Sequence, residues 1–399
     1  MKRCIYIVDD QTQITQVAVR VVRSINPEWE VRGFTDPMEA LVEIKAKAPD
    51  LILSDQMMPG MLGSQLFDQV RLISPPAIRI IMSGHVPLDK LALITSAHQF
   101  LSKPFDSAKL RETILRNFAA QERIMDKGLQ AVATSLGSIP SLAQTHQAVL
   151  KELEDDANGI EGIARRLVED AGLSAKVLQL ANSPLFGQSN LITSPFEAVM
   201  CLGTKMISAV VLAQSLFRHY ESLAGEINIR KVWNHCWQMA YFAQHLCREM
   251  RLPSITGEEA FLAGLLHESG RFILADNFPD QFGAACQVAR ATDTALAPRL
   301  REAFRTSPAQ ITAYILELWG MPATIIAAIA LQDAPAADES KGFTLASALY
   351  VADGVASRQT PRDMFAPEEW NRAYLIAIGC WERIPDWEKL SLGAKPGVS

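Results

Sequence analysis

The sequence predicts a multidomain protein in which an α/β domain with a doubly wound, five-stranded parallel sheet precedes an all-α domain. The first observation is length, since a chain of 399 residues exceeds one ordinary core and predicts two or three domains. The second is that short apolar runs alternate with amphipathic helical segments as far as Phe118. The third is that the strand signal then stops and helix follows helix, with short Gly or Pro punctuation.

Short apolar runs in the first part are expected to be the buried strands of this sheet. They span residues 4–8, 31–34, 51–54, 78–82 and 99–101. A doubly wound parallel sheet binds ligands at the carboxyl ends of its strands, beside the point where the strand order reverses. Polar residues follow four of these runs, namely Asp9 with Asp10, then Asp55, Ser83 and Lys103. Chance would scatter them, so we expect a functional site at this edge of the sheet.

The overall composition is that of an ordinary globular protein. Hydrophobic residues make up 49% of the chain and charged residues 21%, which predicts packed cores and not disorder. The formal net charge of −6 disfavours a phosphate backbone or an anionic membrane, so we expect no direct nucleic-acid or membrane partner. The six cysteines show no C-x-x-C interval and are expected to be reduced. No signal segment or membrane-length apolar run is visible, which favours a cytoplasmic location.

The polar residues at the predicted sheet edge suit metal-assisted phosphoryl transfer. A carboxylate attacks a phosphate poorly because like charges repel, and a divalent cation removes that obstacle. Asp9, Asp10 and Asp55 supply the hard oxygen ligands that Mg²⁺ prefers. Lys103 would contact a phosphoryl oxygen through its charge, and Ser83 through a hydroxyl hydrogen bond. The alternative is that an Asp-Asp pair after a strand only caps the next helix, and the joint placement after four strands is what favours the phosphoryl site.

Residues 1–120 resemble the receiver domain of two-component response regulators, which has a flavodoxin-like fold. The resemblance rests on Ile-Val-Asp-Asp at 7–10, Leu-Ser-Asp-Gln-Met-Met-Pro-Gly at 53–60, Met-Ser-Gly at 82–84 and Phe-Leu-Ser-Lys-Pro-Phe at 100–105. It implies that a sensor histidine kinase donates a phosphoryl group to Asp55. It also implies that Asp10, Asp55 and the carbonyl of Met57 bind Mg²⁺, with Asp9 acting through water.

The same resemblance implies a switch beside the phosphorylation site. The Ser83 hydroxyl would turn towards the phosphoryl group while the ring of Phe100 swings inward. The alternative for Phe100 is an ordinary core aromatic. The family also implies a cis peptide bond between Lys103 and Pro104, which is plausible because cis bonds are cheap only before proline.

A short heptad stripe runs from the end of the receiver region into the segment that follows it. Its positions, six of seven apolar, are Leu115, Phe118, Glu122, Met125, Leu129, Val132 and Leu136. We expect residues 121–137 to form a helical linker that continues the last receiver helix. The stripe then either pairs with a second copy, giving a homodimer, or lies as one amphipathic helix on its own output domain.

Residues 138–399 are expected to form an all-α output domain. They resemble the HDOD domain, a helical relative of HD phosphohydrolases found in bacterial signalling proteins. The matching stretches are 176–187, 192–194 with 198–199 and 202–203, 260–268 and 315–322. The resemblance implies an output domain that binds another signalling protein and carries no demonstrated hydrolytic activity.

Four residues of this second domain stand where HD hydrolases hold catalytic metal: His235, His267, Glu268 and Asp353. HD hydrolases use a first His, a His-Asp pair and a distant Asp, and the metal-bound water attacks a phosphoester. Glu268 replaces the paired aspartate, and its extra methylene moves the carboxylate by about 1–1.5 Å, whereas ligand distances must hold within about 0.2 Å. We therefore expect a vestigial site, either two buried hydrogen-bonded histidines or a residual structural metal, and the only cofactor assigned is the Mg²⁺ of the receiver.

Two functions from different classes remain open at this point. The favoured one is a response regulator whose output domain is not an enzyme and binds a downstream signalling protein. The rival is a phosphorylation-regulated, metal-dependent HD phosphohydrolase. The stretch Ala-Leu-Gln-Asp at 330–333 stands where a His-His pair of the cyclic-dinucleotide-cleaving relatives would be looked for, which disfavours that reaction.

Overall fold

The chain divides into two compact units, which we describe separately. The computed structural model describes residues 2–83, 97–122, 124, 127–135, 149, 152, 159–182, 191–214, 222–223, 227–252, 255, 257–338, 342–359 and 369–390. The first unit comprises Met1–Ser138, Gln179–Leu191 and Tyr314–Met321. The second comprises Ile139–Leu178, Ile192–Ala313 and Pro322–Ser399.

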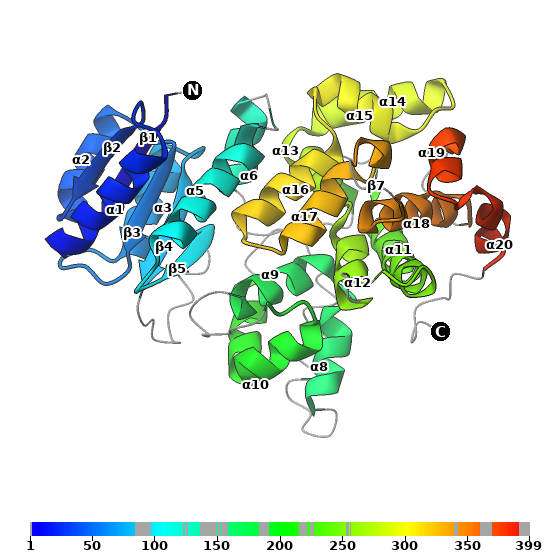
Figure 1. Ribbon diagram of the computed structural model, residues 1–399, viewed down its shortest axis with the longest axis horizontal. Helices are drawn as coiled ribbons and strands as arrows, with labels where there is room; N and C mark the ends of the chain where they lie inside the picture. Colours follow the sequence, from blue (N-terminus) through cyan, green and yellow to red (C-terminus); the bar gives the residue numbers. More distant parts are fainter. Residues whose placement is uncertain are drawn as a thin grey trace. The chain divides into compact units, whose positions relative to one another are not determined.

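The first unit is built on a five-stranded parallel sheet, as the sequence predicts (Figure 1). Its strands are β1 (Cys4–Val8), β2 (Glu30–Phe34), β3 (Leu51–Asp55), β4 (Ile78–Ser83) and β5 (Gln99–Ser102). They pair in the order β2-β1-β3-β4-β5, so the strand order reverses at β1 and its neighbour β3. Every residue of β1 and β3 is buried, which is typical of parallel strands covered on both faces.

Helices cover both faces of the sheet. They are α1 (Thr12–Ile25), α2 (Pro37–Ala46), α3 (Gly63–Ile73) and α5 (Ser107–Glu122). Helix α1 contacts α5 and α2 contacts α3. The start of α2 is fixed locally, because the Asp36 carboxylate accepts a hydrogen bond of 2.8 Å from the Met38 amide and Pro37 occupies the first turn. Tyr6, Ile52 and Phe67 lie fully buried in the core on one side of the sheet.

The expectation that the last receiver helix continues into the linker is wrong. Helix α5 ends at Glu122 and α6 (Lys127–Ser135) begins separately, with Ile124 in no regular structure between them. The side-chain amide of Gln130 donates to the backbone carbonyls of Gln121 and Ile124, so these acceptors are satisfied without an unbroken helix. The residues of the heptad stripe also differ in burial, because Phe118 is buried while Leu115 is 41% exposed. Met125 and Leu136 lie outside the described residues.

The second unit is predominantly helical. Its helices, some of which extend into the first unit, are α8 (Gly159–Leu167), α9 (Ala171–Ala181), α10 (Pro195–Gln214), α11 (Ile229–Glu249), α12 (Gly257–Leu266), α13 (Ser269–Asn277), α14 (Pro279–Ala291), α15 (Leu296–Phe304), α16 (Pro308–Leu318), α17 (Ala323–Leu331), α18 (Leu345–Gln359), α19 (Arg372–Ala377) and α20 (Ile384–Lys389). The all-α expectation misses a small antiparallel pair, β6 (Ser222–Leu223) with β7 (Ile227–Asn228). Strands of two residues are too short to show an alternating pattern in sequence. In the part of the chain that the structure describes, every helix is too short or too polar to span a membrane.

Helices α11, α12 and α18 pack against one another in the second unit (Figure 1). A glycine sets how closely the first two approach: a Cβ atom on Gly264 would lie 2.5 Å from the Cα of Ala240, nearer than real atoms come. This approach matters because α11 carries His235, His267 directly follows α12, and α18 carries Asp353.

Candidate functional site

A lysine joins two carboxylates at the carboxyl edge of the parallel sheet. Lys103 follows β5, and its Nζ forms ion pairs with both Asp9, which follows β1, and Asp55, the last residue of β3. The sheet order explains the meeting, because β1 and β3 are neighbours at the point where the strand order reverses. The structure thus brings together three of the polar residues expected at this edge. The Lys103–Pro104 peptide bond is cis, as the family resemblance implies.

The two carboxylates differ in their surroundings. Asp9 is fully buried, and burial raises the pKa of its carboxyl group although hydrogen bonds from Lys103 and from the Gln11 amide oppose the rise. Asp55 is 8% exposed, and its Oδ2 accepts a hydrogen bond of 2.6 Å from the backbone amide of Met57. Asp55 is therefore the more accessible of the two carboxylates.

The turn after β3 is held by the side chain of Gln56. Its carbonyl oxygen accepts from the Ser64 amide at 3.1 Å, and its backbone oxygen accepts from the Gly63 amide at 3.0 Å. A side chain at Gly63 would not fit, since its Cβ would lie 2.2 Å from the carbonyl oxygen of Asp55. The backbone around Asp55 is therefore fixed by contacts that sequence analysis did not single out.

For the other residues predicted at this site, the structure gives the exposure of two and only the backbone position of the other two. Asp10 is exposed. Met57 is 51% exposed, and its amide contacts Asp55. Ser83 ends β4 and Phe100 lies in β5, but their side chains are outside what the structure describes.

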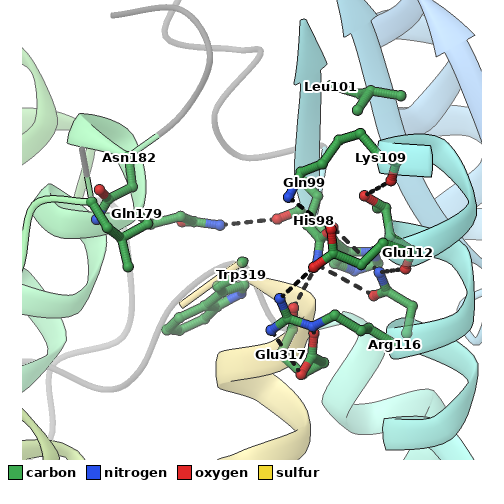
Figure 2. Close-up of a pocket in the computed structure, with 14 residues that line it drawn as sticks. His98, Gln99, Leu101, Lys109, Glu112, Arg116, Gln179, Asn182, Glu317 and Trp319 are labelled. Atoms are coloured by element: carbon green, nitrogen blue, oxygen red, sulfur yellow. Dashed lines mark hydrogen bonds and ion pairs between the residues drawn. The ribbon is translucent and has the colours of Figure 1, made fainter. Parts of the chain in front are cut away.

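A polar pocket of about 210 Å³ lies in the first unit beside β5 and α5. Arg116 of α5 forms a two-point contact with the Glu317 carboxylate, at 2.9 and 3.3 Å. The amide of Gln99 donates to the backbone oxygen of Glu317, and Figure 2 shows Gln179 extending towards His98, to whose backbone oxygen it donates at 3.2 Å. Segments far apart in sequence thus meet on the α5 side of the sheet. Sequence analysis gave no signal for this contact, because it depends on side chains that only tertiary packing brings together.

The four HD-like residues also converge, in the second unit. Oδ1 of Asp353 lies 3.0 Å from Nε2 of His235 and 3.7 Å from Nε2 of His267. Nε2 of His267 lies 3.5 Å from Oε1 of Glu268. One potential ligand atom from each residue lies within 4.8 Å of all the others. His235, His267 and Glu268 are buried, whereas the Asp353 side chain is 37% exposed.

Neighbouring groups orient two members of this quartet. The Nδ1 of His267 lies 2.6 Å from the backbone oxygen of Gly264 and donates to it, which leaves Nε2 as the inward-facing atom. The second carboxylate oxygen of Glu268 pairs with Nε of Arg271 at 2.8 Å. Burial disfavours the imidazolium, yet Cys236, Asp353 and Glu268 together raise the pKa of His267 well above its ordinary value. Arg271 was not singled out from the sequence, although it stands three residues after Glu268, which directly precedes α13.

The fold and the sheet-edge site define a receiver-type α/β domain in a chain that continues into a helical domain. Family models match both parts: the response regulator receiver domain over residues 5–115 and the HDOD domain over residues 139–335. The chain is therefore a response regulator with a receiver domain and an HDOD output domain, as the sequence predicts.

Individual relatives match only parts of the chain. It is 30% identical over 188 residues to the cyclic di-GMP phosphodiesterase response regulator RpfG of Xanthomonas campestris pv. campestris, which covers 44% of this chain and 50% of RpfG. It is 28% identical over 177 residues to the DNA-binding transcriptional regulator NtrC of Escherichia coli, covering 42% of this chain and 37% of NtrC. The chain thus spans half or less of the length of these curated relatives. Among solved structures, the response regulator MmoQ of Methylococcus capsulatus matches with a TM-score of 0.49 and 23% identity, covering 63% of this chain and 98% of MmoQ.

Proposed function

We propose that this chain is a cytoplasmic response regulator that accepts a phosphoryl group on Asp55 from a histidine kinase and signals through protein binding by its HDOD domain. The observation that carries the proposal is the paired contact of Lys103 with Asp9 and Asp55. We also keep the proposed limits of a receiver at residues 1–120, a linker at 121–137 and an output domain from 138 onward.

The transfer step follows from the chemistry of a carboxylate. An oxygen of Asp55 attacks the phosphorus of a phosphohistidine, the P–N bond breaks, and the histidine nitrogen leaves with its electron pair and gains a proton. The product is an acyl phosphate on Asp55. Lys103 lies beside the attacked group, so its ammonium can contact a phosphoryl oxygen once the bond has formed.

The donor set fits the Mg²⁺ that receiver domains generally use. Asp9 and Asp55 already share one cationic contact, and both offer hard oxygen atoms. We propose that Asp9, Asp10, Asp55 and the carbonyl of Met57 hold the ion, which would neutralise charge during the transfer. The buried carboxylate of Asp9 would lie on the inner side of the ion. The exposed carboxylate of Asp10 would bind it from the solvent side.

We propose that the structural change caused by phosphorylation is transmitted from the site to the output domain through β5 and α5. Phe100 lies next to Gln99 in β5, and Ser83 pairs with Ser102 across the β4–β5 ladder. Gln99 and Arg116 both contact Glu317, which belongs to the matched HDOD sequence. A change at the Ser83–Phe100 switch would therefore act on a contact that already involves HDOD residues, whether in a monomer or a homodimer.

We favour protein binding over hydrolysis as the output activity. One oxygen of Glu268 is engaged by Arg271, so this carboxylate is less available to a catalytic metal than the aspartate of an HD pair. Residues 330–333, Ala-Leu-Gln-Asp, also lack the histidine pair expected in cyclic-dinucleotide hydrolases. The name of RpfG attributes phosphodiesterase activity to that protein, and hydrolysis by this chain is the second candidate because its four HD-like residues converge.

One experiment separates the two candidates. The full chain is treated with acetyl phosphate and Mg²⁺, then assayed for co-purifying proteins and for cyclic di-GMP hydrolysis, with Asp55→Asn as the control. We expect a protein partner whose binding changes with phosphorylation in the wild type alone, and no hydrolysis with Mn²⁺ or Zn²⁺ added. Turnover that His267→Ala abolishes would establish the hydrolase instead.

A further inference from the structure

A buried arginine lies at the amino-terminal edge of the parallel sheet, at the opposite end of the strands from Asp55. Arg3 directly precedes β1 and is 7% exposed. It lies at the centre of the Arg3 cluster, which consists of Arg3, Asp50, Phe118, Gln121 and Glu122. We propose that this cluster is an autoinhibitory contact: it fixes the end of α5 and holds the start of α6 beside it, so that the heptad stripe is not available to a second copy. The inference goes beyond the proposed function and does not depend on phosphorylation of Asp55.

The guanidinium group of Arg3 contacts the last turn of α5 through both of its terminal nitrogens. Nη1 donates to Oε1 of Gln121 at 3.0 Å, and Nη2 donates to Oε1 of Glu122 at 3.0 Å. The central carbon of the group lies 4.6 Å from the centre of the Phe118 ring, which also packs edge-to-face against Trp29. Arginine can make all of these contacts at once because its donors and its flat face belong to one rigid group.

The buried contacts of the cluster contribute more than the exposed one. The side chain of Glu122 is 63% exposed, so solvent screens its ion pair with Arg3. Gln121 and Phe118 are both buried, so their contacts are shielded from water. Asp50 ties the arginine to the sheet, because its Oδ1 lies 3.8 Å from Nη1 while its Oδ2 accepts a hydrogen bond of 2.7 Å from the first amide of β1. The cluster therefore joins the end of α5 to the sheet itself.

The chain departs from the line of α5 directly after this cluster. The Ile124 amide donates to the Gln121 carbonyl at 3.1 Å, and the side-chain amide of Gln130 donates to the same carbonyl at 3.0 Å. In an uninterrupted helix, residues nine positions apart are separated by about 13.5 Å along the axis, which is farther than a glutamine side chain reaches. Gln121 therefore contacts Arg3 through its side chain and α6 through its backbone.

This arrangement opposes pairing of two copies along the heptad stripe. Such pairing requires one helix through α5 and α6, with its apolar positions free for the partner. Phe118 faces Arg3, and Leu129 of α6 is buried as well. A second copy that packs on Phe118 has to displace Arg3, which leaves the buried Gln121 oxygen without its donor. A parallel pair also brings the Glu122 carboxylates of the two copies together without the arginine that each contacts.

Amide hydrogen exchange of the full chain, read by mass spectrometry of its peptides, tests the proposal. Arg3→Met removes the guanidinium group and keeps a long side chain. Arg20→Met is the matched control, because Arg20 is an exposed arginine of α1 and its loss changes the net charge equally. Peptides that cover residues 119–132 report the linker, and peptides from β3 report opening of the whole sheet. Each protein is measured at two concentrations about tenfold apart, since protection by a second copy depends on concentration.

We expect the linker amides of Arg3→Met to exchange at least about tenfold faster than those of the wild type and Arg20→Met, with exchange in β3 unchanged. The wild-type linker should exchange at the same rate at both concentrations, because its protection comes from the same chain.

Three results would overturn the proposal: equal linker exchange in Arg3→Met and Arg20→Met, an acceleration in β3 as large as that in the linker, or wild-type linker exchange that slows at the higher concentration. If Arg3→Met fails to fold, Gln130→Ala decides, because it releases α6 from the end of α5 and should speed exchange in the linker alone. Phosphorylation of Asp55 is scored separately by mass, so failure here leaves the proposed function intact.

Discussion

Gly264 of α12 lies directly against Ala240 of α11, so close that a Cβ on the glycine would be 2.5 Å from the alanine Cα. The carbonyl of the same glycine accepts the Nδ1 hydrogen bond of His267. One small residue therefore sets both the spacing of the two helices and the orientation of a histidine in the quartet.

Replacing Gly264 with alanine should force these helices apart. We expect Gly264→Ala to lower the free energy of unfolding by about 1–3 kcal/mol, the usual cost of overpacking. Gly283→Ala is the matched control, since Gly283 lies inside α14 with open space around its Cα, and it should gain about 0.5–1 kcal/mol. Urea denaturation of both variants checks this, and a Gly264→Ala protein as stable as Gly283→Ala would contradict the packing.

Removing the charge of Lys103 should slow phosphorylation. Without it, Asp9 and Asp55 lose the cation that both contact, and repulsion of an incoming phosphoryl group increases. We expect Lys103→Met to react with acetyl phosphate at least about tenfold more slowly, which corresponds to an activation barrier higher by roughly 1.4 kcal/mol. Lys109→Met, which removes an exposed lysine of α5, should keep the wild-type rate. Equal rates in the two variants would remove Lys103 from the site.

The buried Lys176 of α9 should make stability rise with pH. Burial lowers the pKa of its ammonium group to about 7, whereas an unfolded lysine titrates near about 10.4. Between these values the unfolded chain binds a proton that the folded chain has released. The free energy of unfolding therefore gains up to about 1.4 kcal/mol per pH unit from this group.

Denaturation curves at pH 7, 8 and 9 measure this contribution as the difference between the wild type and Lys176→Met. We expect the difference to change steadily in favour of the wild type as the pH rises. A constant difference would show that Lys176 keeps its proton in the folded state.

The contact between Arg116 and Glu317 should be measurable by a double-mutant cycle. Glu317 is 10% exposed and Arg116 is 32% exposed, so solvent screens the pair only in part. We expect a coupling free energy of about 0.5–1 kcal/mol between Arg116→Met and Glu317→Gln. The exposed pair of Asp386 and Lys389 serves as the reference and should give less than about 0.3 kcal/mol. Equal couplings would mean that the Arg116 contact does not persist in solution.

The fold was accessible from sequence because its signals are local. Buried strands appear in the sequence as short apolar runs. The observed ends of the strands lie within one residue of the expected ends, as where β3 ends at Asp55 and not at Ser54. The meeting of Asp9, Asp55 and Lys103 followed from a rule of sheet topology and needed no side-chain geometry.

Other features depend on tertiary contacts that produce no periodic pattern in the sequence. The break between α5 and α6 rests on the side chain of Gln130, which satisfies two backbone carbonyls, and a heptad pattern cannot reveal that. The pairing of Glu317 with Arg116 joins residues 201 positions apart. The close approach at Gly264 reads in sequence as an ordinary helical glycine.

The most direct test of the account is the mass of the full chain after incubation with acetyl phosphate and Mg²⁺, followed by peptide mapping. We expect the gain of one phosphoryl group, labile to base and to hydroxylamine, on the peptide that contains Asp55, and no gain in Asp55→Asn. An unchanged mass in the folded wild type, or a phosphoryl group retained by Asp55→Asn, would contradict the central claim.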